Sequence, residues 1–195
     1  MQAITNAGVW SALTPVEWGI AAGIAVVLVV LLLVLITMRR RPANVIATLD
    51  QHSLGRLSNV VLPRSDDGDI MIEHILLRGD GIKVIDVRSV RGIIFAGDRM
   101  QDWTVMDRGR RFTIANPQST LLDRLAAVRQ AAPNVPVDGV VVFDDKADFR
   151  KGRPSSVIAV SELPQWLGEH HERDPGAQLK EVWTQLREFA LDWRD

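Results

Sequence analysis

The sequence contains no cysteine, which excludes disulfide bonds, thiolate metal sites and cysteine nucleophiles. A chain without cysteine is compatible with a reducing compartment such as the cytoplasm. The motifs of several large enzyme classes are also missing, because there is no Walker loop, no dinucleotide-binding fingerprint and no Ser-His-Asp arrangement. The function therefore has to come from other residue types.

Positive charge is absent from the first 38 residues and then appears abruptly, at Arg39 to Arg41. Directly before these arginines, Gly19 to Met38 forms a run of twenty uncharged and almost wholly apolar residues. As a helix this run would be about 30 Å long, which is the thickness of the hydrocarbon core of a bilayer. The pattern predicts one transmembrane helix over 19–38. The positive-inside rule places residues 1–18 outside the cytoplasm, and a basic juxtamembrane linker, 39–42, inside it.

Two other interpretations of this apolar run agree less well with its length and surroundings. A cleaved secretory signal would have a basic start, a shorter apolar stretch and a small-residue cleavage site. A buried core helix rarely continues this far without a polar residue. Within the run, Gly19 and Gly23 form one small-xxx-small pair. Because this spacing is typical of membrane helices that associate, a homo-oligomer is among the expected partners.

The chain after the arginines has the length of one globular domain. From Arg39 onward, the arginines included, the chain carries all 23 Lys and Arg residues and 23 of the 24 acidic residues, since Glu17 is the one charged residue before the arginines. This part has no net charge, so it lacks the global basic field that most nucleic-acid binders use, and such a contact would depend on local patches. The local cluster Arg108, Arg110 and Arg111, which would lie near Arg88 in a continuous meander, could contact phosphates or simply solvate a turn.

Hydrophobic periodicity and turn residues predict a mixed α/β domain in which a hairpin-rich sheet is flanked by helices. Helices are predicted at 43–54, from 116 to 133, at 161–167 and at 174–192. Strands are predicted at 57–62, 70–77, 82–87, 92–96, 102–106, 111–114, 137–143 and 156–160, with the three between 92 and 114 extending the central hairpin as a meander. The last helix is strongly amphipathic, and its apolar stripe is expected to pack on the sheet or to meet a protein partner.

The strands on either side of residues 78–81 are predicted to form an antiparallel hairpin. If these four residues are the loop, Leu77 pairs with Ile82, and Glu73 lies directly opposite Asp86. A shorter loop would misplace Glu73. Two adjacent carboxylates repel unless a cation lies between them, and such oxygen ligands favour Mg²⁺ or Mn²⁺. The register predicts a metal site at Glu73 and Asp86, with a solvated pair of acids as the alternative.

Other side chains near this pair follow from strand alternation. Asp86 and Arg88 are two residues apart, so they should point to the same face of the sheet. His74 follows Glu73 directly and should face away from it. We therefore expect His74 to be packed or hydrogen-bonded rather than to act as a catalytic base.

The ordered features from residue 69 to Trp103 resemble the nuclease-related domain, a bacterial relative of the PD-(D/E)XK nucleases with a restriction-endonuclease-like core. That family shows an acidic-Ile-Asp-His-hydrophobic strand, a Gly turn, an Ile-Glu-x-Lys strand, a Gly-containing turn, a Trp and later an Asn-Pro helix start. Here these features fall at 71–75, 79–81, 85–88, Gly92, Trp103, and Asn116 with Pro117. The resemblance predicts a nuclease-related domain over 43–170 and says nothing about the apolar run or the last helix.

The resemblance implies that Glu73, Asp86 and Arg88 are the catalytic residues and that the two acids hold the metal. The family has Asp, Glu and Lys at these positions, so the acids are swapped and an arginine replaces the lysine. Arginine can clamp a phosphate, but it cannot accept a proton from water as a lysine of depressed pKa can. On the following helix, relatives offer Gln and His where this chain has Thr120 and Arg124, its expected substrate-binding residues beside the local arginine cluster.

These departures predict a nucleic-acid-associated nuclease-fold domain in which metal-dependent phosphodiesterase activity is degenerate, reduced or absent. Together with the apolar run, the resemblance implies a single-pass protein of the bacterial inner membrane with its domain in the cytoplasm. The alternative is a non-catalytic scaffold or protein-binding module, tethered to the membrane, that uses the same fold.

Overall fold

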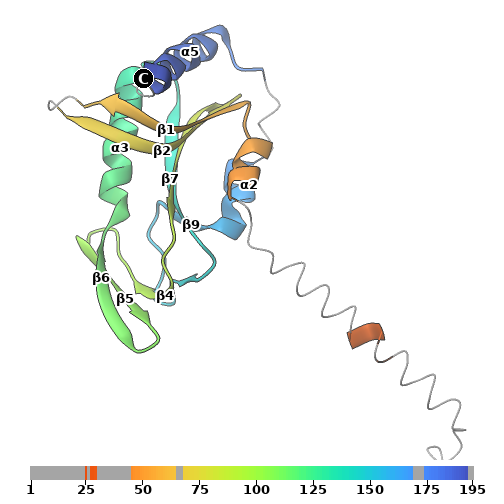
Figure 1. Cartoon of the computed structure of the whole chain (residues 1–195), viewed down its shortest axis with the longest axis vertical. Helices are drawn as coiled ribbons and strands as arrows, with labels where there is room; N and C mark the ends of the chain where they lie inside the picture. Colours follow the sequence, from red (N-terminus) through yellow and green to blue (C-terminus); the bar gives the residue numbers. More distant parts are fainter. Residues whose placement is uncertain (1–24, 26, 30–44, 65–67, 169–173, 193–195) are drawn as a thin grey trace, which may run out of the picture. The chain divides into compact units, whose positions relative to one another are not determined.

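The computed structural model describes residues 25, 27–29, 45–64, 68–168 and 174–192 (Figure 1). The chain divides into two compact units, Met1–Pro42 and Ala43–Asp195. No helix within the described ranges is both long and apolar enough to cross a bilayer. The predicted helix over 19–38 stays a prediction, because all but four of its residues lie outside the described part of the chain.

The larger unit is built on a mixed five-stranded sheet, which confirms the predicted α/β class. Its strands are β1 (Gly55–Pro63), β2 (Asp69–Arg78), β3 (Gly81–Arg88), β7 (Val137–Phe143) and β9 (Val157–Ala159), and this is also their order across the sheet. The first three strands pair antiparallel, whereas β3, β7 and β9 run parallel. Each of these strands lies where the residue pattern predicts one.

Helices cover both faces of this sheet (Figure 1). α3 (Pro117–Ala131) and α5 (Ala177–Asp192) pack on one face, and α2 (Val45–Gln51) and α4 (Leu163–Leu167) pack on the other. Apolar residues alternate between the two cores, so Val84 of β3 lies in the core with α3 and Ile85 in the core with α2. The apolar stripe of α5 packs on the sheet. Its Trp183 ring lies close to Gly55, where a side chain would place a Cβ atom only 3.0 Å from the ring.

The strands between 92 and 115 form a second sheet instead of extending the central hairpin. This sheet has the order β6 (Arg110–Ala115), β5 (Asp102–Asp107), β4 (Gly92–Phe95) and β8 (Ala147–Asp148). The predicted meander is wrong at this point because β7 occupies the edge of β3 that β4 would need. The two-residue strand β8 was not predicted, since it has no apolar run.

Three aromatic side chains join the second sheet to the first. Trp103 of β5 is fully buried, and its ring centroid lies 6.1 Å from that of Phe143 at the end of β7. Phe149 packs edge to face against both rings, with centroid distances of 6.3 Å to Trp103 and 5.2 Å to Phe143. Phe143 is the register partner of Arg88 in the β3–β7 pair. The aromatic cluster therefore holds the second sheet beside Arg88.

Candidate functional site

The β2–β3 hairpin has the predicted register but a tighter turn. Leu77 pairs with Ile82 as expected, and the pairing continues to Arg78 and Gly81, which leaves a two-residue turn in place of the four-residue loop. Gly81 has a φ of +139°, and a Cβ atom there would lie 2.5 Å from the Pro136 carbonyl oxygen, so the turn requires glycine. The shorter turn leaves the register unchanged because Arg78 and Gly81 extend the same ladder.

The two candidate acids have different partners. Backbone pairing stops one position before Glu73 and Asp86 would face each other, at the pair of His74 and Ile85. Beyond that point the Glu73 Oε2 atom accepts a hydrogen bond from the Val87 backbone N–H at 2.9 Å. The Glu73 carboxylate thus continues the connection between the strands.

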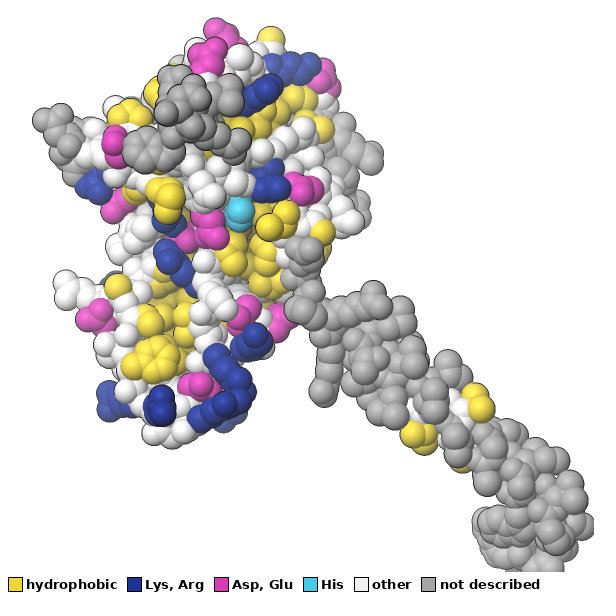
Figure 2. All heavy atoms as spheres, viewed as in Figure 1, with side chains coloured by type: hydrophobic (Ala, Val, Ile, Leu, Met, Phe, Trp, Pro, Cys, Tyr) yellow, Lys and Arg dark blue, Asp and Glu magenta, His cyan; other side chains and the backbone are white. Residues whose placement is uncertain are grey.

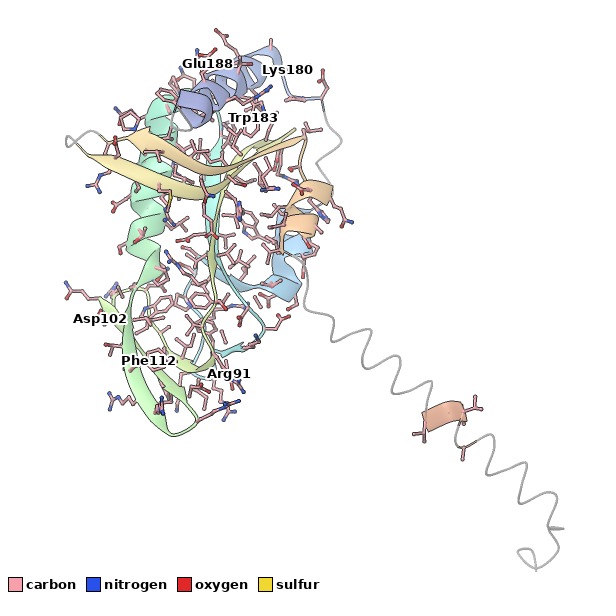
Figure 3. All side chains as sticks on the ribbon, in the orientation of Figure 1. Arg91, Asp102, Phe112, Lys180, Trp183 and Glu188 are labelled. Atoms are coloured by element: carbon pink, nitrogen blue, oxygen red, sulfur yellow. The ribbon has the colours of Figure 1, made fainter. Side chains whose placement is uncertain are left out.

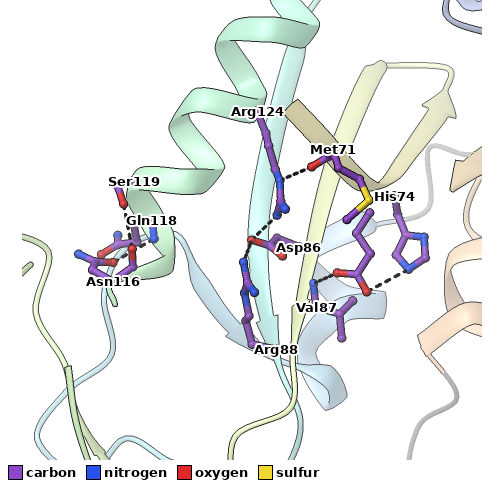
Figure 4. A network of polar contacts seen from close by, with 10 residues as sticks. Met71, His74, Asp86, Val87, Arg88, Asn116, Gln118, Ser119 and Arg124 are labelled. Carbon is purple, nitrogen blue, oxygen red and sulfur yellow. Dashed lines mark hydrogen bonds and ion pairs between the residues drawn. The ribbon is translucent and has the colours of Figure 1, made fainter. Parts of the chain in front are cut away.

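Asp86 is a buried carboxylate held by two arginines (Figure 4). Its side chain is 1% exposed, and its Oδ2 atom lies 2.8 Å from Arg88 Nη2 and 2.7 Å from Arg124 Nη1. Arg88 comes from the same face of β3, as strand alternation predicts, and Arg124 comes from α3. The Arg124 Nε atom also donates to the Met71 carbonyl of β2 at 2.8 Å. Arg124 thereby ties α3 to both strands of the hairpin.

The charges of this cluster do not cancel. A buried carboxylate is costly without cations, and the two guanidinium groups offset this cost. One carboxylate between two guanidinium groups leaves a net charge of +1 on Asp86, Arg88 and Arg124. One buried nitrogen atom, Arg88 Nε, has no hydrogen-bond partner among the described residues, and Arg124 Nη1 has only its ion pair with Asp86. Because guanidinium nitrogens are donors, Arg88 Nε suits an anion and cannot ligate a cation.

His74 is hydrogen-bonded, as predicted, but the prediction that it faces away from Glu73 is wrong, because the two side chains approach each other at the end of the hairpin pairing. A contact of 3.2 Å joins the Nδ1 atom of His74 to the Ser58 hydroxyl of β1, and its Nε2 atom is 3.9 Å from Glu73 Oε1. Burial lowers the pKa of His74, with the Glu73 charge acting in the opposite direction. The ring therefore favours its neutral form.

A cleft of about 480 Å³ opens between the end of β3, the end of β6 and the start of α3. Arg88, Ala115 and Thr120 are among the residues that line it. The side chain of Arg88 is 38% exposed, so Arg88 connects the buried Asp86 to this open space. Two predicted site residues, Arg88 and Thr120, thus meet in one cleft.

The predicted start of α3 at Asn116 and Pro117 is confirmed, and it shapes the rim of the cleft. The Asn116 side chain caps the helix by accepting the Gln118 backbone N–H at 2.9 Å. The Gln118 amide donates to Asp98 Oδ1, also at 2.9 Å, and Asp98 further accepts the Ser155 backbone N–H at 3.0 Å. These hydrogen bonds hold down the pKa of Asp98. Neither Gln118 nor Asp98 was predicted: Gln118 directly follows the Asn-Pro start, but Asp98 lies before β5 in the sequence and meets Gln118 only in the fold.

The local arginine cluster lies at the far end of β6 from the cleft. Arg108 is in the turn between β5 and β6, and Arg110 and Arg111 begin β6, whereas Ile114 and Ala115 at its other end line the cleft. Arg88 therefore lies near Ile114 and Ala115, at the opposite end of β6 from Arg110 and Arg111.

The comparison with known families identifies one match. Residues 39–144, more than half of the chain, match the model of the nuclease-related domain family. This range contains Glu73, Asp86, Arg88 and Arg124 and ends directly after β7. No curated protein and no solved structure matches the chain. The family predicted from the ordered sequence features is confirmed.

Proposed function

This chain belongs to the nuclease-related domain family, and we propose that it is a membrane-anchored, nucleic-acid-associated domain of the nuclease fold with reduced or absent metal-dependent phosphodiesterase activity. The observation that carries the proposal is the buried Asp86 carboxylate, which has an arginine on each side. We interpret the fold as the restriction-endonuclease-like core of the family, in which the β2–β3 hairpin carries the site.

The residues around Asp86 do not fit a divalent cation as they are arranged. A hydrolytic metal is held between carboxylates and acidifies a water molecule beside the scissile phosphate. At Asp86 the positive charge already comes from Arg88 and Arg124, so Mg²⁺ or Mn²⁺ would have to displace at least one guanidinium group. Within the described ranges no three His, Asp or Glu side chains come together as a metal-binding group. These contacts favour a site that works without metal.

Among the described residues that line the cleft, none is a carboxylate or a histidine that could accept a proton from water. The guanidinium of Arg88 stays protonated and cannot accept a proton. The Glu73 carboxylate is engaged by the Val87 N–H and is not paired with Asp86. A phosphodiester bound in the cleft would therefore lack the group that prepares the attacking water.

Phosphate binding suits the same residues well. Arg88 is anchored by Asp86 at 2.8 Å, so its guanidinium group is oriented before a ligand arrives. The Thr120 hydroxyl belongs to the same cleft and can donate a further hydrogen bond. The net charge of +1 on the cluster supports the binding of one backbone phosphate.

The apolar run over 19–38 and the three arginines after it support anchoring in the bacterial inner membrane with the domain in the cytoplasm. Membrane fractions washed with alkaline carbonate would test this part of the proposal. The full chain should stay in the pellet, and a chain lacking residues 1–38 should be released. Release of both chains would contradict an anchor.

A second candidate function is a protein-binding scaffold that uses α5. Phe189 of α5 is 40% exposed and lines a hollow of about 510 Å³ together with residues at the end of α3, among them Ala131 and Pro133. An exposed aromatic side chain beside an apolar hollow is typical of a surface that meets a protein or a second copy of the chain.

The proposal is tested by measuring cleavage and binding on the same preparations of the full chain in detergent. Labelled single- and double-stranded DNA and RNA are incubated with Mg²⁺ or Mn²⁺, beside Asp86→Asn and Glu73→Ala. We expect no cleavage by the wild type beyond that of the two variants. Binding measured in EDTA should persist and should weaken about tenfold in Arg88→Ala, but not in Arg187→Ala, a matched exposed arginine on α5. Cleavage that needs Mg²⁺ or Mn²⁺ and that Asp86→Asn abolishes would contradict a site that works without metal.

A further inference from the structure

The β5–β6 hairpin concentrates positive charge, although the chain from Arg39 onward has no net charge. Arg108, Arg110 and Arg111 are all exposed, and Asp107 beside them already pairs with Arg91 at 3.6 Å. Figure 2 shows Lys and Arg side chains gathered at the end of the domain where this hairpin lies. The hairpin is therefore a local basic patch of the kind that a domain without net positive charge needs in order to hold a polyanion.

The tip of the hairpin is a tight two-residue turn. Asp107 pairs with Arg110, and the two residues between them, Arg108 and Gly109, both have positive φ angles, of 48° and 80°. This combination is typical of a type I′ turn, which matches the twist of the flanking strands. The start of β6 is thereby held in a defined position.

One face of β6 leads from this basic tip to the cleft. Alternate residues of a strand share a face, so Arg110, Phe112 and Ile114 lie on one side and Arg111 on the other. Ile114 lines the same cleft as Arg88. The side chains of one strand face thus follow the order arginine, aromatic ring, cleft, over a distance of about 13 Å.

Phe112 is an aromatic side chain left in solvent along this path (Figure 3). It is 45% exposed, although its partner across the strands, Val105, is fully buried. Exposed aromatic rings beside basic residues are the surfaces on which single-stranded nucleic acids stack their bases. A base pair inside a duplex keeps its faces covered by its neighbours and cannot stack in this way.

We propose that the face formed by Arg110, Phe112 and Ile114 guides single-stranded nucleic acid into the Arg88 cleft. Arg110 contacts a backbone phosphate, Phe112 stacks on a base, and Arg88 binds a phosphate further along the strand. This inference rests on the proposed function, because it takes the cleft as a nucleic-acid site. An extended polymer fits better than a lipid surface because the charge, the ring and the cleft lie along one strand.

The test is fluorescence anisotropy of labelled oligothymidine and of a duplex of equal length, with the full chain in detergent and EDTA. We expect single strands to bind more tightly than duplex. Phe112→Ala and Phe112→Leu should weaken single-strand binding about tenfold, since both remove the ring. Phe189→Ala, an exposed aromatic on α5, should leave it unchanged.

Adjacent arginines on opposite faces of β6 provide a second, matched comparison. Arg110→Ala should weaken binding several-fold and lower the magnitude of the salt slope by about 0.7, the value for one lost contact to a single strand. Arg111→Ala should have a smaller effect. Because Arg110, Arg111 and Phe112 are all exposed, each variant should unfold at the same temperature as the wild type. An unchanged midpoint of thermal unfolding then shows that its fold is intact.

The outcomes separate this inference from the proposed function. If Arg88→Ala weakens binding while Phe112→Ala and Arg110→Ala bind like the wild type, the path along β6 is overturned and the cleft remains. Equal binding of duplex and single strand overturns the path as well. If the wild type binds no oligonucleotide, the proposed function fails and the path fails with it.

Discussion

The two sheets differ in how far helices and loops cover them. β3 in the first sheet is buried along most of its length, and the Asp86 cluster lies within its α3-facing side. β6 in the second sheet is exposed at five of its six positions. Burial on both faces stabilises the fold and fixes the arginines around Asp86, whereas an exposed edge strand contributes little packing and is free to contact a ligand.

The largest expected effect breaks the connection between the two sheets. Trp103→Ala removes a fully buried indole from the cluster with Phe143 and Phe149, so we expect a loss of about 4 kcal/mol in the free energy of unfolding. Phe112→Ala, in the same sheet but exposed, should change it by less than about 0.5 kcal/mol. Urea unfolding followed by circular dichroism measures both. Equal losses of stability would mean that the exposed strand β6 contributes as much to the fold as the buried side of the second sheet.

The next effect concerns the buried cluster of the first sheet. Asp86→Ala leaves the guanidinium group of Arg124, which is 12% exposed, without its carboxylate, and should destabilise the protein by about 3 kcal/mol. Asp102→Ala, an exposed acid at the start of β5, is the matched control and should cost less than about 0.5 kcal/mol. The same urea midpoints serve as the readout. If Asp86→Ala left the free energy of unfolding unchanged, the ion pairs would not stabilise this face of β3.

A smaller effect follows from the titration of His74. Burial lowers its pKa in the folded state below the unfolded value of about 6.5, so the neutral ring contributes stability above about pH 6.5 that is lost as the pH falls through the folded pKa. Between about pH 7 and about pH 5, wild type should lose more stability than His74→Gln. Unfolding midpoints at both pH values test this. Parallel losses in the two proteins would assign the pH dependence to other groups.

The strands of the first sheet were predictable because burial leaves a strong residue pattern. β7 was predicted at its observed bounds from an apolar run, and β2 and β3 from β-branched residues around a glycine turn. Of the second sheet, β4, β5 and β6 were predicted one by one, but β8 and the separation of this sheet from the first were not. Which edge a strand joins depends on β7, which lies far along the chain and pairs with β3.

The candidate site was predictable only where it depends on local geometry. Strand alternation placed Asp86 and Arg88 on one face, and the register of the hairpin was right. The ion pair of Arg124 with Asp86 was not foreseen, because it depends on how α3 packs across the hairpin. For the same reason the sequence suggested a carboxylate pair, whereas Glu73 bonds to the Val87 backbone.

The central claim is that arginines occupy the place of a metal at Asp86, and a Mn²⁺ titration followed by electron paramagnetic resonance tests it most directly. The double variant Arg88→Lys with Arg124→Gln removes one of the two fixed positive charges and is the matched comparison, expected to gain a Mn²⁺ site. The account predicts that wild type and Asp86→Asn give the same weak background signal. A wild-type Mn²⁺ site that Asp86→Asn abolishes would contradict it.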